Sequence, residues 1–299
     1  MKQRFCLMTS VFIVMTAVCA GATTSSITGV FNWATMGIDA EVRLNLRSLG
    51  VSLPTGRSRA EERLFSEYYA NIQPFIYSIP VDSSSVLGDF VERGELTPAM
   101  VETLARKADM IPPAISTDIQ NITASYRISL SEVCSTLIRH HSGAEFPSVV
   151  NPKPVQTWTG IIIIARDELP VHGRNSTALL QPCLFPKIWD TDMNLVFDKK
   201  HTNPALYRDA TMVNYMGSSH IFRRTASGLS PEIERIVGNK PLRIIARRVF
   251  GINPTDPVID SEDALLILSS EENKRLLREG RIAIIPAESV LKKELHAEL

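Results

Sequence analysis

The residue run that most constrains the fold is Gly160-Ile161-Ile162-Ile163-Ile164-Ala165, the most apolar segment after the first 20 residues. Its length suits a strand better than a helix, and it has no polar position that would face solvent. Branched Cβ atoms favour extended backbone, and an unbroken apolar run is typical of a strand buried on both faces. We therefore expect this segment in the interior of a sheet.

The chain is expected to divide just before this strand. Residues 142–157 contain Gly143, Pro147, Pro152 and Pro154 and few large apolar side chains, which is typical of a linker. A length of 299 residues suits one or two domains. We predict an N-terminal unit at 27–141, a C-terminal unit at 158–286 and a tail at 287–299.

The first unit shows both strand and helix patterns. Alternation at 30–33 and 42–46 predicts a hairpin that turns around Gly37, with Val42, Leu44 and Leu46 on one face. Apolar residues at helical spacing predict a helix at 58–76, and start and stop signals predict a second at 83–94. Thr97 is the predicted N-cap of a third helix, which Pro112-Pro113 ends. A strand at 126–130 and a short helix at 134–138 follow.

The second unit continues this mixture. We expect a hairpin from 184–189 and 195–197, a helix at 231–237, a strand at 242–249, two capped helices between 260 and 280, and a closing strand at 282–285. Both units therefore belong to the α+β class, with mixed or antiparallel sheets packed against helices.

The first 20 residues have the pattern of a signal peptide. Lys2 and Arg4 precede an apolar stretch at 5–18, and small residues end at Ala20. This stretch is about 14 residues long, whereas a membrane-spanning helix needs roughly 20. We expect cleavage before Gly21 and a mature protein in the periplasm or at the periplasmic face of the outer membrane. An uncleaved anchor and a lipid anchor at Cys19 remain alternatives.

The overall charge gives little attraction to polyanions. Thirty-two basic and 32 acidic residues cancel, so a nucleic-acid partner is disfavoured. Hydrophobic residues make up 44% and charged residues 21%, which is typical of a globular protein.

The mature chain would keep two cysteines, Cys134 and Cys183. Two cysteines form one disulfide or remain as two buried thiols, and the sequence leaves both alternatives open. Neither has the closely spaced partners of a zinc site.

The sequence lacks the usual signatures of hydrolases, nucleotide-binding proteins and dinucleotide-binding proteins. The six histidines include no pair four residues apart, and there is no Gly-x-Ser-x-Gly, phosphate-loop or Gly-x-Gly-x-x-Gly pattern. We therefore expect a non-enzymatic protein without a cofactor.

The best single location for a binding site is the loop after the isoleucine-rich strand. Arg166, Asp167, Glu168 and His172 follow that strand, where sheet proteins often place sites. A soluble ligand-binding or enzymatic domain that uses this loop is the alternative to a purely structural role.

A second candidate is an acidic segment that resembles part of a calcium loop. Asp190, Asp192, Asn194 and Asp198 occupy its positions 1, 3, 5 and 9. Leu195 and His201, however, stand where glycine and glutamate would complete the loop, and Asp and Asn side chains also cap turns of their own backbone.

Four segments of the second unit share motifs with one family. They are 158–166 (WTGIIIIAR), 184–192 (LFPKIWDTD), 239–246 (NKPLRIIA) and 255–264 (TDPVIDSEDA). They resemble, in order, segments of bacterial envelope proteins related to the flagellar H-ring protein FlgT and small outer-membrane lipoproteins that share its domains. Ile164 and Met193 depart from the pattern, in place of an aspartate and a hairpin glycine, and 169–177 is an insertion. The helix-forming segment at 57–69 is similar to the unit that precedes this domain.

This resemblance implies a structural role in the outer envelope. Family members of known role are non-enzymatic parts of, or accessories to, the envelope and the flagellar base. The expected partners are therefore envelope or flagellar proteins, with peripheral or lipid-anchored membrane association.

Overall fold

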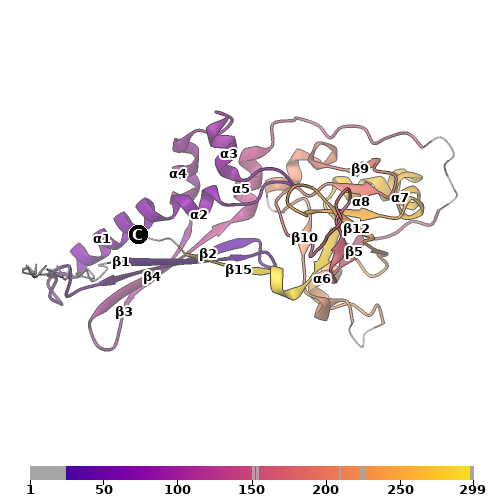
Figure 1. Cartoon of the computed structure of the whole chain (residues 1–299). Helices are drawn as coiled ribbons and strands as arrows, with labels where there is room; N and C mark the ends of the chain where they lie inside the picture. Colours follow the sequence, from indigo (N-terminus) through magenta and orange to yellow (C-terminus); the bar gives the residue numbers. More distant parts are fainter. Residues whose placement is uncertain (1–24, 150–151, 153–154, 209, 223–225, 297–299) are drawn as a thin grey trace, which may run out of the picture.

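The computed structural model describes residues 25–149, 152, 155–208, 210–222 and 226–296. The predicted signal peptide at 1–20 lies outside these residues, as do Cys6 and Cys19. The described chain has the predicted α+β fold, with helices packed on sheets (Figure 1). The sheets are antiparallel and mixed, as predicted, and one four-stranded sheet of the second unit is parallel. In this part of the chain, no helix has both the length and the apolar character needed to span a membrane.

The first unit is built on a five-stranded antiparallel sheet with the order β15-β1-β2-β4-β3. Its strands are β1 (Ser25–Asn32), β2 (Gly37–Asn45), β3 (Asp109–Ile115), β4 (Asn121–Ser129) and β15 (Lys292–His296). Its helices are α1 (Arg57–Asn71), α2 (Gln73–Tyr77), α3 (Leu87–Glu92), α4 (Pro98–Arg106) and α5 (Leu130–Leu137). Figure 1 shows α1, α2 and α4 over one face of the sheet, while no described helix covers the opposite face.

Side-chain alternation explains this one-sided cover. The predicted hairpin is confirmed as β1 and β2, and Val42 and Leu44 on β2 are buried towards the helices. In α1, Ala60, Leu64 and Tyr68 recur every four residues and are fully buried. A sheet with one apolar and one polar face leaves the polar face to solvent.

Strand β3 was not predicted from the sequence. Pro112 and Pro113 do exclude a helix there, but Asp109–Ile115 forms an edge strand that pairs with β4. Proline lacks the N–H group needed inside a sheet and is tolerated at an edge. The register shifts between Ile111 and Ala114, across the two prolines.

The segment at 287–299 is more than the tail that we expected. Lys292–His296 forms β15, which pairs antiparallel with β1 and completes the first sheet (Figure 1). Leu295 is 9% exposed and lies opposite Gly29, whose position faces the Phe75 ring. Alternation over so short a strand, with three charged side chains, gave no clear signal in the sequence.

The second unit contains a parallel sheet, β10-β14-β5-β11, and a mixed sheet, β12-β13-β8-β9. The parallel strands are β5 (Ile161–Ala165), β10 (Asn214–Tyr215), β11 (Leu242–Ile245) and β14 (Ile282–Pro286). The mixed strands are β8 (Ile188–Asp190), β9 (Leu195–Phe197), β12 (Arg248–Phe250) and β13 (Asp256–Ile259). A small hairpin joins β6 (Leu169–Pro170) to β7 (Thr177–Ala178), and the helices are α6 (Pro231–Val237), α7 (Ser261–Leu268) and α8 (Glu271–Arg278). Four short 3-10 helices are η1 (Lys199–His201), η2 (Pro204–Arg208), η3 (Ser218–His220) and η4 (Glu288–Val290).

The isoleucine-rich strand is in the sheet interior, as predicted. β5 lies between β14 and β11, and Ile161, Ile162 and Ile163 are at most 1% exposed. The strand expected at 242–249 is instead two strands in different sheets, β11 and β12.

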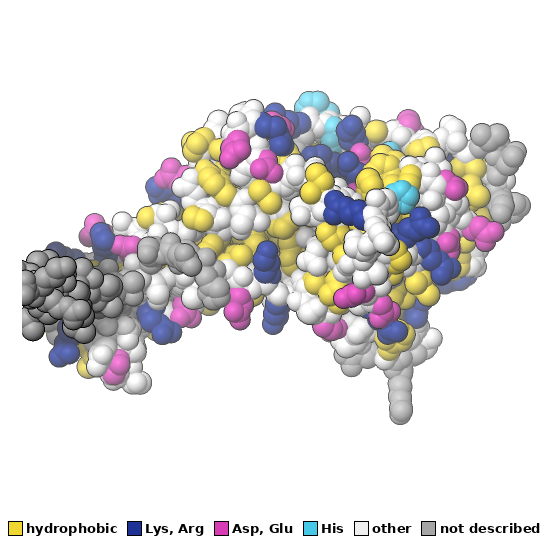
Figure 2. All heavy atoms as spheres, in the orientation of Figure 1, with side chains coloured by type: hydrophobic (Ala, Val, Ile, Leu, Met, Phe, Trp, Pro, Cys, Tyr) yellow, Lys and Arg dark blue, Asp and Glu magenta, His cyan; other side chains and the backbone are white. Residues whose placement is uncertain are grey.

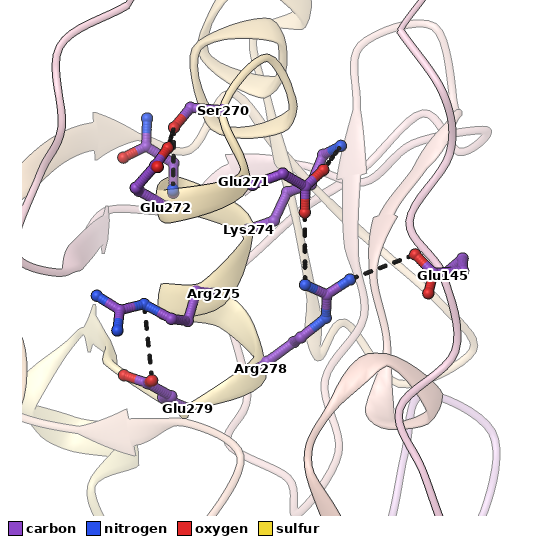
Figure 3. A network of polar contacts seen from close by, with 9 residues as sticks. Glu145, Ser270, Glu271, Glu272, Lys274, Arg275, Arg278 and Glu279 are labelled. Carbon is purple, nitrogen blue, oxygen red and sulfur yellow. Dashed lines mark hydrogen bonds and ion pairs between the residues drawn. The ribbon is translucent and has the colours of Figure 1, made fainter.

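The residues that join the two units pack against the second one. Residues 142–149 form no helix or strand, yet the ring of Phe146 is buried and stacks on His201 with centroids 4.6 Å apart. Arg278 of α8 lies between Glu145 and Glu271 (Figure 3). Its guanidinium nitrogens are 3.5 and 3.6 Å from the two carboxylates. Residues 145 and 146 of the predicted linker therefore pack against η1 and α8 of the second unit.

The two described cysteines resolve the alternative left open by the sequence. Cys134 and Cys183 are free thiols, and both are buried. Burial raises the pKa of each thiol, so neither has the thiolate character of a reactive cysteine.

Candidate functional site

The predicted loop begins with two exposed charges at the carboxyl end of β5. The Arg166 and Asp167 side chains are 51% and 79% exposed and form an ion pair, with Nε 3.5 Å from Oδ2. The Arg166 guanidinium also lies 5.7 Å from the centre of the Phe222 ring. Pairs as exposed as this one contribute little to stability.

The other two predicted residues point elsewhere. Glu168 accepts a hydrogen bond of 3.0 Å from the Thr177 hydroxyl, which ties β6 to β7. His172 lies edge-on against Phe250, and its Nδ1 is 3.4 Å from Nη1 of Arg248. The four side chains thus lie in one loop but do not converge on a common point.

The predicted metal ligands also serve local structure. Asp190 accepts hydrogen bonds from the backbone N–H groups of Asp192 and Asn194, at 3.0 and 2.7 Å, as a turn-capping side chain does. Asp198 accepts from the Lys200 N–H at 2.8 Å. Among the described residues, no group of three or more His, Cys, Asp or Glu side chains could hold a metal ion.

A buried carboxylate that the sequence did not reveal is Asp256 on β13. It is fully buried and accepts hydrogen bonds from the Lys187 N–H, the Trp189 indole and the Thr255 hydroxyl, at 3.0–3.2 Å. Burial raises the pKa of Asp256 above its ordinary value, and the three hydrogen bonds oppose that shift. Because its donors lie on or beside β8 and β13, Asp256 joins these strands.

The most exposed apolar surface of the first unit lies on the β3–β4 hairpin. Ile111 and Ile119 are 66% and 62% exposed, and Met110 is 38% exposed. This hairpin extends away from the helices at the lower left of Figure 1. Its base borders a shallow hollow of about 530 Å³ on the open face of the sheet.

The backbone of the hairpin is unusual at its turn. Ile119 has φ +57°, a left-handed conformation that is costly for a β-branched residue. Asp118 holds the turn by accepting hydrogen bonds from the Ser116 hydroxyl and the Gln120 N–H. The hydrogen bond from Ser116 is the main reason that the pKa of Asp118 is lowered. A strained, exposed isoleucine suggests a role other than stability.

The outer edge of β3 is a further feature of this hairpin. β3 is the last strand of the sheet and pairs with β4, so its outer backbone groups at 109–111 have no strand partner among the described residues. Unpaired edges accept strands from other chains, and prolines limit such pairing. Pro112 and Pro113 therefore confine any added strand to the first part of β3.

The fold and this surface define a two-unit α+β protein with a projecting apolar hairpin. In a comparison with protein families, each unit is similar to one family of domains. Residues 24–136 match the N-terminal domain of Treponema pallidum Tp0624, and residues 160–288 match its second domain. The two matches occur in the order that their names give, and strand β15 lies beyond both. No curated protein matches the chain.

Proposed function

We propose that this chain is an exported, non-enzymatic protein of the bacterial envelope that binds a protein partner through the β3–β4 hairpin. The observation that carries the proposal is the exposure of Met110, Ile111 and Ile119 on an edge strand and its turn. Exposed apolar residues gathered on one element are typical of interaction surfaces. The narrower role, an accessory of the flagellar base or outer envelope, rests on the family resemblance.

The charges beside the apolar residues favour a protein over an anionic membrane. Asp118 precedes Ile119 at the turn, and its negative charge is repelled by anionic lipid surfaces. Asp109 begins β3, but it lies opposite Arg127, which offsets its charge. The partner we propose has an apolar recess with basic residues at its rim and offers an extended segment to the edge of β3.

Cross-linking tests this interface. With a photoreactive residue at position 111, the mature chain is expected to yield one discrete protein product in envelope extract. The same probe at Ile252, which is 69% exposed on a turn of the second unit, is the matched control and is expected to yield none. Equal products from both positions, or labelling of lipid alone, would refute the interface. The identity of the product decides between a flagellar and another envelope partner.

A substitution at the turn separates binding from stability. Ile119→Gly relieves the positive φ angle and is expected to stabilise the protein by up to about 1 kcal/mol. The same change removes an apolar contact and is expected to weaken the cross-link at position 111 severalfold. An unchanged cross-link would show that Ile119 does not contact the partner.

Export is tested by the mass of the mature protein. Cleavage of the predicted signal peptide gives a chain that begins at Gly21 and is recovered in the periplasmic or outer-membrane fraction. A diacylated Cys19 start would instead indicate a lipoprotein. Full-length chain in the cytosolic fraction would contradict the envelope proposal.

A further inference from the structure

A basic recess lies between the two units, away from the hairpin. Its volume is about 240 Å³, and it lies among α3, the end of α5 and η1. Its polar lining comprises four basic residues and one acidic residue: Arg139, His140, Lys199, Lys200 and Glu95. In Figure 2, histidine and Lys/Arg side chains lie next to one another along the upper edge of the molecule, near α5.

The acidic residue in this recess already has a partner. The Glu95 carboxylate pairs with Arg93, with Oε1 2.7 Å from Nε. Arg139 donates a hydrogen bond to the Glu95 backbone oxygen, which leaves its positive charge without a carboxylate. Within the described residues, Arg139, Lys199 and Lys200 form no ion pair within 4.0 Å.

Lys199 is the innermost of these charges. Its ammonium group lies 5.7 Å from the Phe90 ring and 5.0 Å from the Phe185 ring, one ring from each unit. A partly buried ammonium group loses hydration, and its contacts with aromatic rings compensate for only part of that loss. Burial accordingly lowers the pKa of Lys199, although the charges of Asp82 and Glu95 oppose the shift.

The backbone around Lys199 is held in place by local contacts. Asp198 caps the 3-10 helix η1 through the Lys200 N–H, and the Asp198 N–H donates to Nδ1 of His201 at 3.1 Å. On the opposite side, Nε2 of His140 is 3.1 Å from the Thr202 oxygen, and the Ala144 N–H donates to the Lys200 oxygen. The two segments that supply the basic residues are therefore fixed to each other.

We infer that this recess binds a phosphate group, which Lys199, Lys200 and Arg139 hold. A phosphate carries up to two negative charges and several acceptor oxygens, so it suits three cationic donors better than a single carboxylate does. Phe90 and Leu137 offer an apolar wall to whatever the phosphate is attached to. This inference is independent of the hairpin and of the proposed partner protein.

Titration of the purified protein, with both units present, with inorganic phosphate at constant ionic strength tests the inference. The melting temperature of the wild type is expected to rise with phosphate concentration. Lys199→Met keeps an apolar side chain of similar length between the two rings but removes the charge, and is expected to bind phosphate at least about tenfold more weakly. Lys240→Gln, at an exposed lysine of the second unit, is the matched control and should bind as the wild type does.

Vesicles separate the two sources of a phosphate group. Phosphatidylcholine vesicles with and without phosphatidylglycerol are sedimented with the wild type and with Lys199→Met. Sedimentation that needs both phosphatidylglycerol and Lys199 identifies a lipid headgroup, whereas phosphate binding without sedimentation identifies a soluble phosphate compound. The inference is overturned if phosphate and vesicles bind the wild type no better than Lys199→Met, or if Lys240→Gln loses as much affinity as Lys199→Met. Without phosphate, Lys199→Met should melt no lower than the wild type, which excludes misfolding as the cause.

Discussion

Replacement of Asp256 by alanine is expected to lower the free energy of unfolding by about 3–5 kcal/mol. The change removes the acceptor of three hydrogen bonds in a place that solvent does not reach. The Thr255 hydroxyl would then be buried without this acceptor, and the Lys187 N–H and the Trp189 indole would lose theirs at part-buried positions. A buried group without a partner costs about 1–3 kcal/mol. Urea denaturation, followed by tryptophan fluorescence, measures the effect.

The matched control for this substitution is Asp167→Ala. Asp167 is a carboxylate of the same unit with a side chain that is 79% exposed, and its removal is expected to change stability by less than about 0.5 kcal/mol. If Asp256→Ala were as mild as Asp167→Ala, the hydrogen bonds to Asp256 would contribute little to the fold.

The pH dependence of the Asp256 effect has a definite sign. Because the folded-state pKa of Asp256 is raised, the folded protein binds the proton of this carboxyl group more tightly than the unfolded chain does. The contribution of Asp256 is therefore complete below its ordinary pKa of 3.8 and declines as the pH rises through the folded-state value. The stability difference between the wild type and Asp256→Asn, measured at several pH values, is expected to decrease with rising pH.

Replacement of Gly160 by alanine is expected to destabilise the second unit by about 3 kcal/mol or more. A Cβ atom at this position would lie 2.4 Å from Cα and 2.5 Å from the carbonyl oxygen of Val237. Both are backbone atoms at the end of α6, so no side-chain rotation relieves the overlap. Thr159 fixes the same contact, since its hydroxyl donates to the Val237 oxygen at 2.7 Å.

Gly88→Ala is the matched control for Gly160→Ala. Gly88 lies in α3, where the nearest atom to an added Cβ is the Tyr77 oxygen at 3.4 Å. Alanine also favours helix formation over glycine, so the change is expected to stay within about 1 kcal/mol of the wild type. Thermal unfolding of both variants compares the two sites. Equal melting temperatures would mean that α6 moves away from β5 at little cost.

The sequence predicted those helices and strands whose structure is determined by residues close together in the chain. The alternation of Val42 and Leu44, the cap at Thr97 and the isoleucines of β5 each act within a few residues, and each prediction is confirmed. Strand β13 was missed because its first residues, Asp256 and Pro257, resemble a turn. Its burial depends on donors from residues 187 and 189, which are distant in sequence.

The candidate surface was missed for a similar reason. An isoleucine in a sequence indicates burial, and only the three-dimensional arrangement leaves Ile111 at an edge and Ile119 on a turn. The position of the 166–172 loop after β5 was predicted correctly. The directions of its candidate side chains, however, depend on contacts with Thr177, Phe222 and Phe250, which are distant in sequence. The recess at Lys199 joins residues from both units, which no local pattern brings together.

The pairing of β15 with β1 sets an order of assembly. β1 begins at Ser25, yet one of its two neighbours in the sheet, β15, is formed by residues 292–296. Until residue 296 has been synthesised, one edge of β1 has no partner strand, and such an edge can pair wrongly with other chains. The first sheet therefore cannot be completed before residue 296 has been synthesised, and β15 then covers the exposed edge of β1.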